Sequence, residues 1–208
     1  MWMTLCKSLC ASLSELCFPS LCISCEAKID KGILCHFCSE KIELISTKNR
    51  CHTCFEESEG RCFRCIKEKL HPRAFTCENY GPVQSLALQL SSNLQIQKNI
   101  GSLMVVQLCS LSWPIPDVLI PLSSKEREAI SLAKQISSFI SSEVKSIIRK
   151  KRFILDQLGY SVKKGVNLSD KNCLVVSLYG LKEKEREVIA EKLYQAAPKG
   201  VYFLSFLS

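Results

Sequence analysis

The chain has 208 residues, of which 47% are hydrophobic, and its formal net charge is +8. This composition is typical of a folded globular protein and excludes intrinsic disorder as the main state. The length fits one medium domain with a small appendage. No apolar run approaches the about 20 residues that a transmembrane helix needs, so we expect no membrane span.

The first residues, 1–16, are fairly apolar but are interrupted by Lys7 and by serines, and no small-residue cleavage site follows them. We therefore predict a short amphipathic helix here rather than a secretory signal. A chain without a signal is expected in the cytoplasm, where a cysteine-rich region favours bound metal over disulfides. The predicted apolar stripe of this helix is Leu5, Leu9, Leu13 and Leu16.

Eight of the 14 cysteines fall into four C-x-x-C pairs within residues 22–65. A tetrahedral zinc ion takes four thiolates, and two such pairs supply them. Eight thiolates predict two zinc ions, whose binding supplies much of the folding energy of a region this small. Disulfides and redox pairs are the alternative interpretations. Sequential pairing of the knuckles is the simplest arrangement, and a cross-braced pairing uses the same residues. The predicted ligands are Cys22, Cys25, Cys35, Cys38, Cys51, Cys54, Cys62 and Cys65.

Apolar periodicity begins at Tyr80, after the last cysteine pair. Ser123 and Glu126 form a capping box that predicts a long helix, with an apolar stripe reaching Ile147 and a basic run at its end. Alternating strands and helices predict an α/β fold with a mostly parallel sheet, in which ligands bind at the carboxyl ends of the strands. The predicted helices are 82–90, 96–108, 123–152 and 181–196, and the predicted strands are 117–121, 173–178 and 201–207.

The order of these pieces resembles the ComF family of bacterial competence proteins, over roughly residues 16–208. The matching features are Phe18-Pro19 before the first knuckle, the four knuckles, and Tyr-Gly-Pro-Val at 80–83. The resemblance implies a type I phosphoribosyltransferase-like α/β domain behind a small double zinc-ribbon-like module. Together with the apolar pattern of the first residues, the end of the cysteine pairs and the charge contrast between the two parts of the chain, this predicts an N-terminal helix (1–16), a zinc-binding module (17–72) and a phosphoribosyltransferase-like domain (73–208).

The chain departs from this family at the loop that resembles the site for phosphoribosyl pyrophosphate. The family pattern D-D-V-x-T-T-G supplies two acids for the ribose hydroxyls and a loop that cradles the 5′-phosphate. In this sequence the acids and both threonines are missing, and the R-G-F-N-Q-like stretch is replaced by residues 123–129. We therefore assign no catalytic residue. The degenerate phosphate-loop positions are Ser177, Leu178, Tyr179, Gly180, Leu181 and Lys182.

The excess charge lies in the C-terminal part, because residues 79–208 carry a net +7 and residues 1–78 a net +1. A basic run there is suited to tracking a phosphate backbone, with Phe153 and Tyr160 as candidates for stacking on bases. The alternative is a solvated helix end. The candidate nucleic-acid-binding residues are Arg149, Lys150, Lys151, Arg152, Lys163 and Lys164.

Three functions remain open at this point. The first is a non-catalytic ComF-like competence protein that binds single-stranded DNA or a DNA-uptake helicase. The second is an active phosphoribosyltransferase with a diverged loop. The third is a structural zinc scaffold for protein–protein interaction.

Overall fold

The computed structural model describes residues 20–59, 62–68, 70–91, 93–122, 126–151, 159–163 and 165–208. The predicted N-terminal helix over residues 1–16 lies outside these ranges, as do Arg152, Phe153 and Lys164. In the part of the chain that is described, no helix is both long enough and apolar enough to cross a bilayer.

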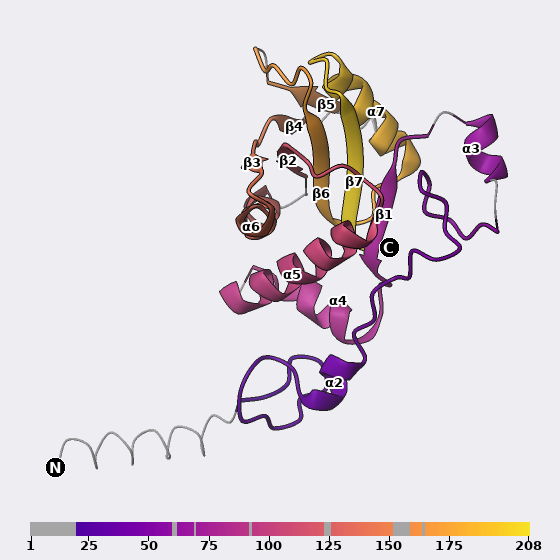
Figure 1. The fold of residues 1–208 in the computed structure, drawn as a ribbon. Helices are drawn as coiled ribbons and strands as arrows, with labels where there is room; N and C mark the ends of the chain where they lie inside the picture. Colours follow the sequence, from indigo (N-terminus) through magenta and orange to yellow (C-terminus); the bar gives the residue numbers. More distant parts are fainter. Residues whose placement is uncertain are drawn as a thin grey trace.

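Five strands form one sheet in the order β1-β7-β6-β2-β3, and every neighbouring pair is parallel (Figure 1). The predicted α/β class with a mostly parallel sheet is confirmed. β1 was not predicted, although its short run of Phe75 and Thr76 is typical of a strand. The strands are β1 (Arg73–Cys77), β2 (Val118–Pro121), β3 (Glu143–Val144), β6 (Asn172–Tyr179) and β7 (Gly200–Leu207).

Apolar layers cover both faces of this sheet. In β6, Leu174 and Val176 pack on one face, and Cys173 and Val175 pack on the other, so the strand is buried on both sides. One layer consists of α4 (Gly81–Leu88), α5 (Leu94–Ser110) and α6 (Glu126–Ile140). The other consists of α7 (Glu183–Tyr194) and an antiparallel hairpin, β4 (Ile148–Lys151) with β5 (Gly159–Val162).

The prediction of one long helix reaching the basic run is wrong, because α6 ends at Ile140. Ser141 has a positive φ of 55°, and the Ser137 hydroxyl donates to the carbonyl of Ser142 at 2.6 Å. Serine side chains compete in this way with the helical hydrogen bonds. The chain then enters β3 and β4, so Val144 and Arg149 lie in strands.

α5 and α6 lie close together at Gly101, where a Cβ atom would lie 2.8 Å from the Cβ of Gln135. We expect Gly101→Ala to lower the free energy of unfolding by about 1–3 kcal/mol, because the two helices would have to separate. Chemical denaturation followed by circular dichroism measures this difference. Ser102→Ala, one residue along the same helix, is the control and should change it by less than about 0.5 kcal/mol.

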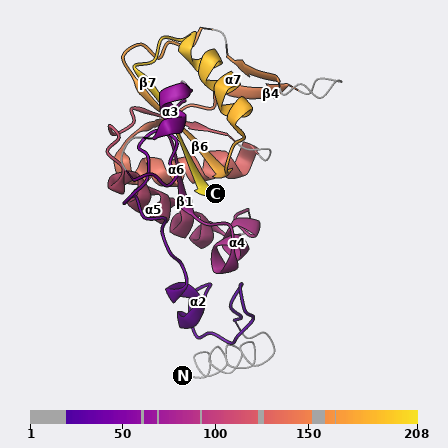
Figure 2. The same cartoon turned by 90° about the vertical axis from the view of Figure 1, so that its right-hand side faces the viewer.

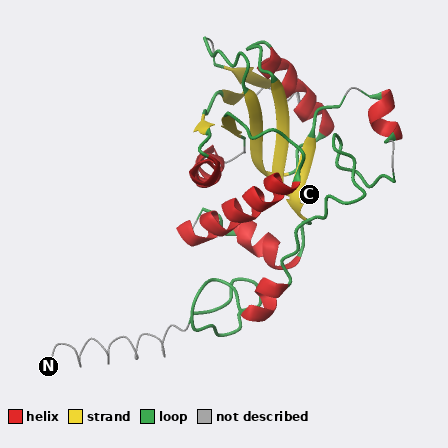
Figure 3. Ribbon diagram, in the orientation of Figure 1, coloured by secondary structure: helices red, strands yellow, loops and turns green. Residues whose placement is uncertain are grey.

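The cysteine-rich region consists of loops and two short helices, α2 (His36–Glu40) and α3 (Phe63–Lys67) (Figure 3). We call residues 20–41 the first cysteine unit and residues 49–68 the second. The two units lie apart: α2 is beyond α4 at one end of the molecule, whereas α3 lies beside α7 (Figures 1 and 2).

Candidate metal centres and the switch point of the sheet

The eight predicted ligands form two groups of four, and the sulfur atoms within each group all lie within 4.8 Å of one another. The grouping is sequential and not cross-braced: the first two knuckles form one group and the last two form the other. The Sγ atoms of Cys51 and Cys65 are 3.5 Å apart, and those of Cys25 and Cys35 are 3.6 Å apart. A disulfide needs about 2.05 Å, whereas a tetrahedral zinc–thiolate centre has sulfur atoms about 3.8 Å apart. Both donor sets therefore fit zinc.

The two units share the same backbone turn after their first knuckle. The backbone N–H of Glu26 donates to the carbonyl of Cys22 at 2.9 Å, and the backbone N–H of Phe55 donates to the carbonyl of Cys51 at 3.0 Å. Both donors have positive φ angles, 60° for Glu26 and 62° for Phe55, so the turn after each first knuckle is the same. In each unit a short helix then carries the second knuckle. The two units thus share the turn after the first knuckle, whereas the segment between their knuckles is two residues longer in the first unit.

The pKa values of the thiols differ within each group of four cysteines. Burial opposes ionisation of Cys22, but hydrogen bonds from the backbone N–H groups of Cys35 and of its own knuckle outweigh it and lower the pKa to about 6. Burial raises the pKa of Cys38, in the same group, to about 12. Burial also raises the pKa of Cys77 to about 12, with a further contribution from the Glu78 carboxylate. The geometry of the sulfur atoms therefore defines the two groups, and Cys77 is a neutral core thiol outside them.

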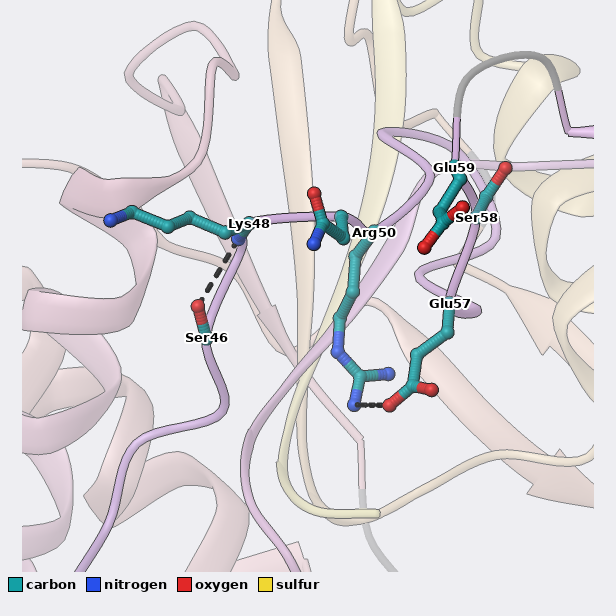
Figure 4. Close-up of a pocket in the computed structure, with 7 residues that line it drawn as sticks. Ser46, Lys48, Arg50, Glu57, Ser58 and Glu59 are labelled. Atoms are coloured by element: carbon teal, nitrogen blue, oxygen red, sulfur yellow. Dashed lines mark hydrogen bonds and ion pairs between the residues drawn. The ribbon is translucent and has the colours of Figure 1, made fainter.

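A polar surface pocket of about 470 Å³ lies beside the second unit (Figure 4). Arg50 lines it and pairs with Glu57 at 3.2 Å, while Ser46 accepts a hydrogen bond from the backbone N–H of Lys48. The Arg50 guanidinium also donates to the carbonyl of Phe55 at 2.9 Å, so it supports the turn of the knuckle.

The strand order reverses between β2 and β6, because the chain leaves β2 for β3 on one side and returns to β6 on the other. In such sheets this switch point is where ligands bind, at the carboxyl ends of the strands. There Ser177 is buried and bonded to the Ser205 hydroxyl at 2.8 Å, Leu178 is buried, and Tyr179 is exposed. Residues 123–125, which follow β2, lie outside the described ranges. The described side chains here offer no carboxylate to a ribose.

Helices bind phosphate groups at their N-termini. At the N-terminus of α7, two glutamates of the chain itself lie in that position. Glu185 accepts a hydrogen bond from the backbone N–H of Lys182 at 3.1 Å, and Glu183 pairs with Arg64 from the second cysteine unit. Positive charge at a helix N-terminus attracts anions, and these glutamates already neutralise it. Gly180 lies against Phe75, whose ring is 2.8 Å from the position of a Cβ atom there.

Among the basic candidates that the structure describes, Arg149, Lys150 and Lys151 lie on β4 and Lys163 follows β5, so they lie on a hairpin instead of at a helix end. Arg149 is opposite Ser161 in the strand register, and the backbone N–H of Lys163 donates to the carbonyl of Ile147 at 2.9 Å. Both Arg149 and Lys163 are exposed. The expectation that Tyr160 stacks on bases is wrong: its ring is buried and its hydroxyl donates to Glu185 at 3.1 Å. Burial, and next the Glu185 charge, raise the pKa of Tyr160 to about 12.

Three residues that join the second unit to the sheet were not predicted: Phe55, Arg64 and Arg73. The sequence does carry a signal for Phe55: it directly follows the knuckle cysteine Cys54 and is apolar, whereas the corresponding residue after Cys25 is the charged Glu26. The two arginines carry no sequence signal, because their partners are distant in the chain.

No family model and no curated protein matches this chain. Solved structures do match it, among them a purine phosphoribosyltransferase from Pyrococcus horikoshii, with 16% identity and a TM-score of 0.40 over 51% of this chain and 68% of that one. An allosteric regulatory enzyme of purine biosynthesis matches with 15% identity and a TM-score of 0.42, over 57% of this chain and 30% of its own length. A hypoxanthine-guanine phosphoribosyl transferase from L. donovani matches with 10% identity and a TM-score of 0.39, over 61% of this chain and 73% of that one.

Proposed function

We propose that this chain is a zinc-binding, non-catalytic protein of the ComF type whose β4–β5 hairpin binds single-stranded DNA. The eight cysteines would hold two zinc ions, which supply folding energy to the two units. The observation that carries the proposal is the N-terminus of α7, where Glu183 and Glu185 stand in the place of a bound phosphate.

The side chains that fill the switch point support the proposed absence of transferase chemistry. Leu178 and Tyr179 occupy the positions where the family pattern has acids, and an apolar or phenolic side chain does not accept hydrogen bonds from two ribose hydroxyls as a carboxylate does. A phosphate brought to α7 would meet the two glutamates and be repelled.

Phosphoribosyl pyrophosphate with Mg²⁺ is therefore expected to leave the melting temperature unchanged. A ligand at 100 times its dissociation constant would stabilise the fold by about 2.7 kcal/mol, which thermal scanning detects readily. Pyrophosphate with Mg²⁺ at the same concentration controls for general ion effects. A saturable rise in melting temperature with the full ligand alone would favour an active transferase with a diverged loop.

DNA binding is proposed on the exposed cations of the hairpin. Fluorescence anisotropy of a labelled single-stranded oligonucleotide should give log affinities that fall linearly with log salt. Arg149→Ala and Lys163→Ala should each weaken binding and reduce that slope by about 1, whatever the base sequence.

The control is Lys184→Ala, because Lys184 is exposed on α7 beside glutamates and its loss should leave the slope unchanged. No binding at low salt would overturn the DNA part of the proposal. The zinc-binding units would then be left as a surface for a protein partner, either a DNA-uptake helicase or another protein held on a zinc scaffold.

A further inference from the structure

We propose that the second cysteine centre is a metal-dependent clamp that holds the edge strand β1 and the N-terminus of α7, whereas the first centre stabilises its own unit and the packing of that unit against the core away from α7. This inference rests on the zinc binding proposed above and is independent of DNA binding. Three separate contacts reach from the second knuckles into the α/β domain.

The first contact joins the knuckle backbone to the start of β1. The backbone N–H of Arg73 donates to the carbonyl of Thr53 at 2.8 Å, and its guanidinium Nε donates to the carbonyl of Cys54 at 2.6 Å. Thr53 and Cys54 belong to the metal-binding loop itself. The edge strand is thus bonded to the atoms whose positions the metal would set.

The second contact is an aromatic anchor next to a ligand. Phe55 follows Cys54, is only 3% exposed and belongs to the same core cluster as α4, α5 and one face of the sheet. Its ring packs edge-on against Phe75 of β1, with centroids 6.3 Å apart. The equivalent residue of the first unit, Glu26, has the same left-handed backbone and is exposed.

The third contact is an ion pair carried by α3. Arg64 lies between the ligands Cys62 and Cys65 and pairs with Glu183, the first residue of α7. It also pairs with Glu56 at 3.3 Å. A helix of five residues does not persist without tertiary support, so metal loss would release Arg64 from its place.

The first unit is built differently. Cys22, Ile29 and Cys38 form a small buried cluster of their own. Apolar side chains such as Ile23 and Ile33 pack against the main core. The helix of this unit, α2, lies beyond α4 and away from α7 (Figures 1 and 2). Metal loss at this centre would therefore leave β1 and α7 in place.

The test compares Cys51→Ser/Cys54→Ser with the matched variant Cys22→Ser/Cys25→Ser in the full zinc-loaded chain. Zinc per chain is measured by mass spectrometry, and local opening by amide hydrogen exchange of β1 and of the first turn of α7. Each variant should lose one zinc of two. Exchange in β1 and in α7 should accelerate about tenfold or more in the second-centre variant alone.

A third variant, Arg64→Met, keeps all eight ligands and removes the ion pairs of Arg64 with Glu183 of α7 and, inside the unit, with Glu56 and Glu68. The bonds of Arg73 to Thr53 and Cys54 stay intact. This variant should retain two zinc ions and accelerate exchange in the first turn of α7 while leaving β1 unchanged. If the second-centre variant fails to fold while the first-centre variant folds, the clamp is supported, and the Arg64→Met result still decides the α7 link.

Equal exchange in the two cysteine variants, or zinc loss at the second centre with no change in β1, would overturn the clamp and leave zinc binding standing. A wild-type chain that is folded and holds no zinc would overturn both.

Discussion

Truncating the Phe55 ring is expected to lower the free energy of unfolding by about 3–5 kcal/mol, because Phe55→Ala empties a buried site next to Phe75. The positive φ of 62° does not offset this loss, since alanine keeps the Cβ atom that strains this backbone. Denaturant unfolding of the zinc-loaded chain, followed by tryptophan fluorescence and circular dichroism, measures the change.

The matched control for this substitution is Phe63→Ala, in the same unit and one residue after a ligand. Phe63 is 80% exposed, so the change should stay within about 0.5 kcal/mol. Equal effects of the two substitutions would mean that the second unit does not share the core of the sheet, and would also remove the aromatic anchor from the clamp.

Replacing Cys54 with alanine is expected to remove one zinc ion per chain and to destabilise the chain by several kcal/mol. Tetrathiolate centres contribute their binding energy directly to folding, and three remaining thiolates hold zinc far less tightly. Zinc content by mass spectrometry and thermal unfolding at fixed zinc concentration give the two readouts.

Cys77 provides the matched control, because it is as deeply buried as Cys54 and lies outside both four-cysteine groups. Cys77→Ala should keep two zinc ions and cost only about 1–2 kcal/mol through the lost packing. Retention of two zinc ions by the Cys54 variant would contradict the proposed ligand set.

Much of the α/β domain was predictable because its signals are local. Pro82 marks the first helix, and the apolar run at 173–178 is a strand buried on both faces. The end of α6 was missed, because an apolar stripe at helical spacing continues through Val144 to Ile147. The hydroxyls of Ser137 and Ser142 donate to the carbonyls of Ser142 and Pro116, and these bonds favour ending the helix at this point. Neither acceptor can be identified from periodicity.

The sequence by itself determined the donor sets suited to a metal ion, since a two-residue gap places both sulfur atoms of a knuckle toward one point whatever the rest of the chain does. It also placed Leu178 and Tyr179, and no carboxylate, at the end of β6. The tertiary structure decided which knuckles share a centre, which unit joins the sheet, and that Arg149 lies in a hairpin strand and not at a helix end. These outcomes depend on register and on contacts between distant residues, such as Arg64 with Glu183, which no local pattern encodes.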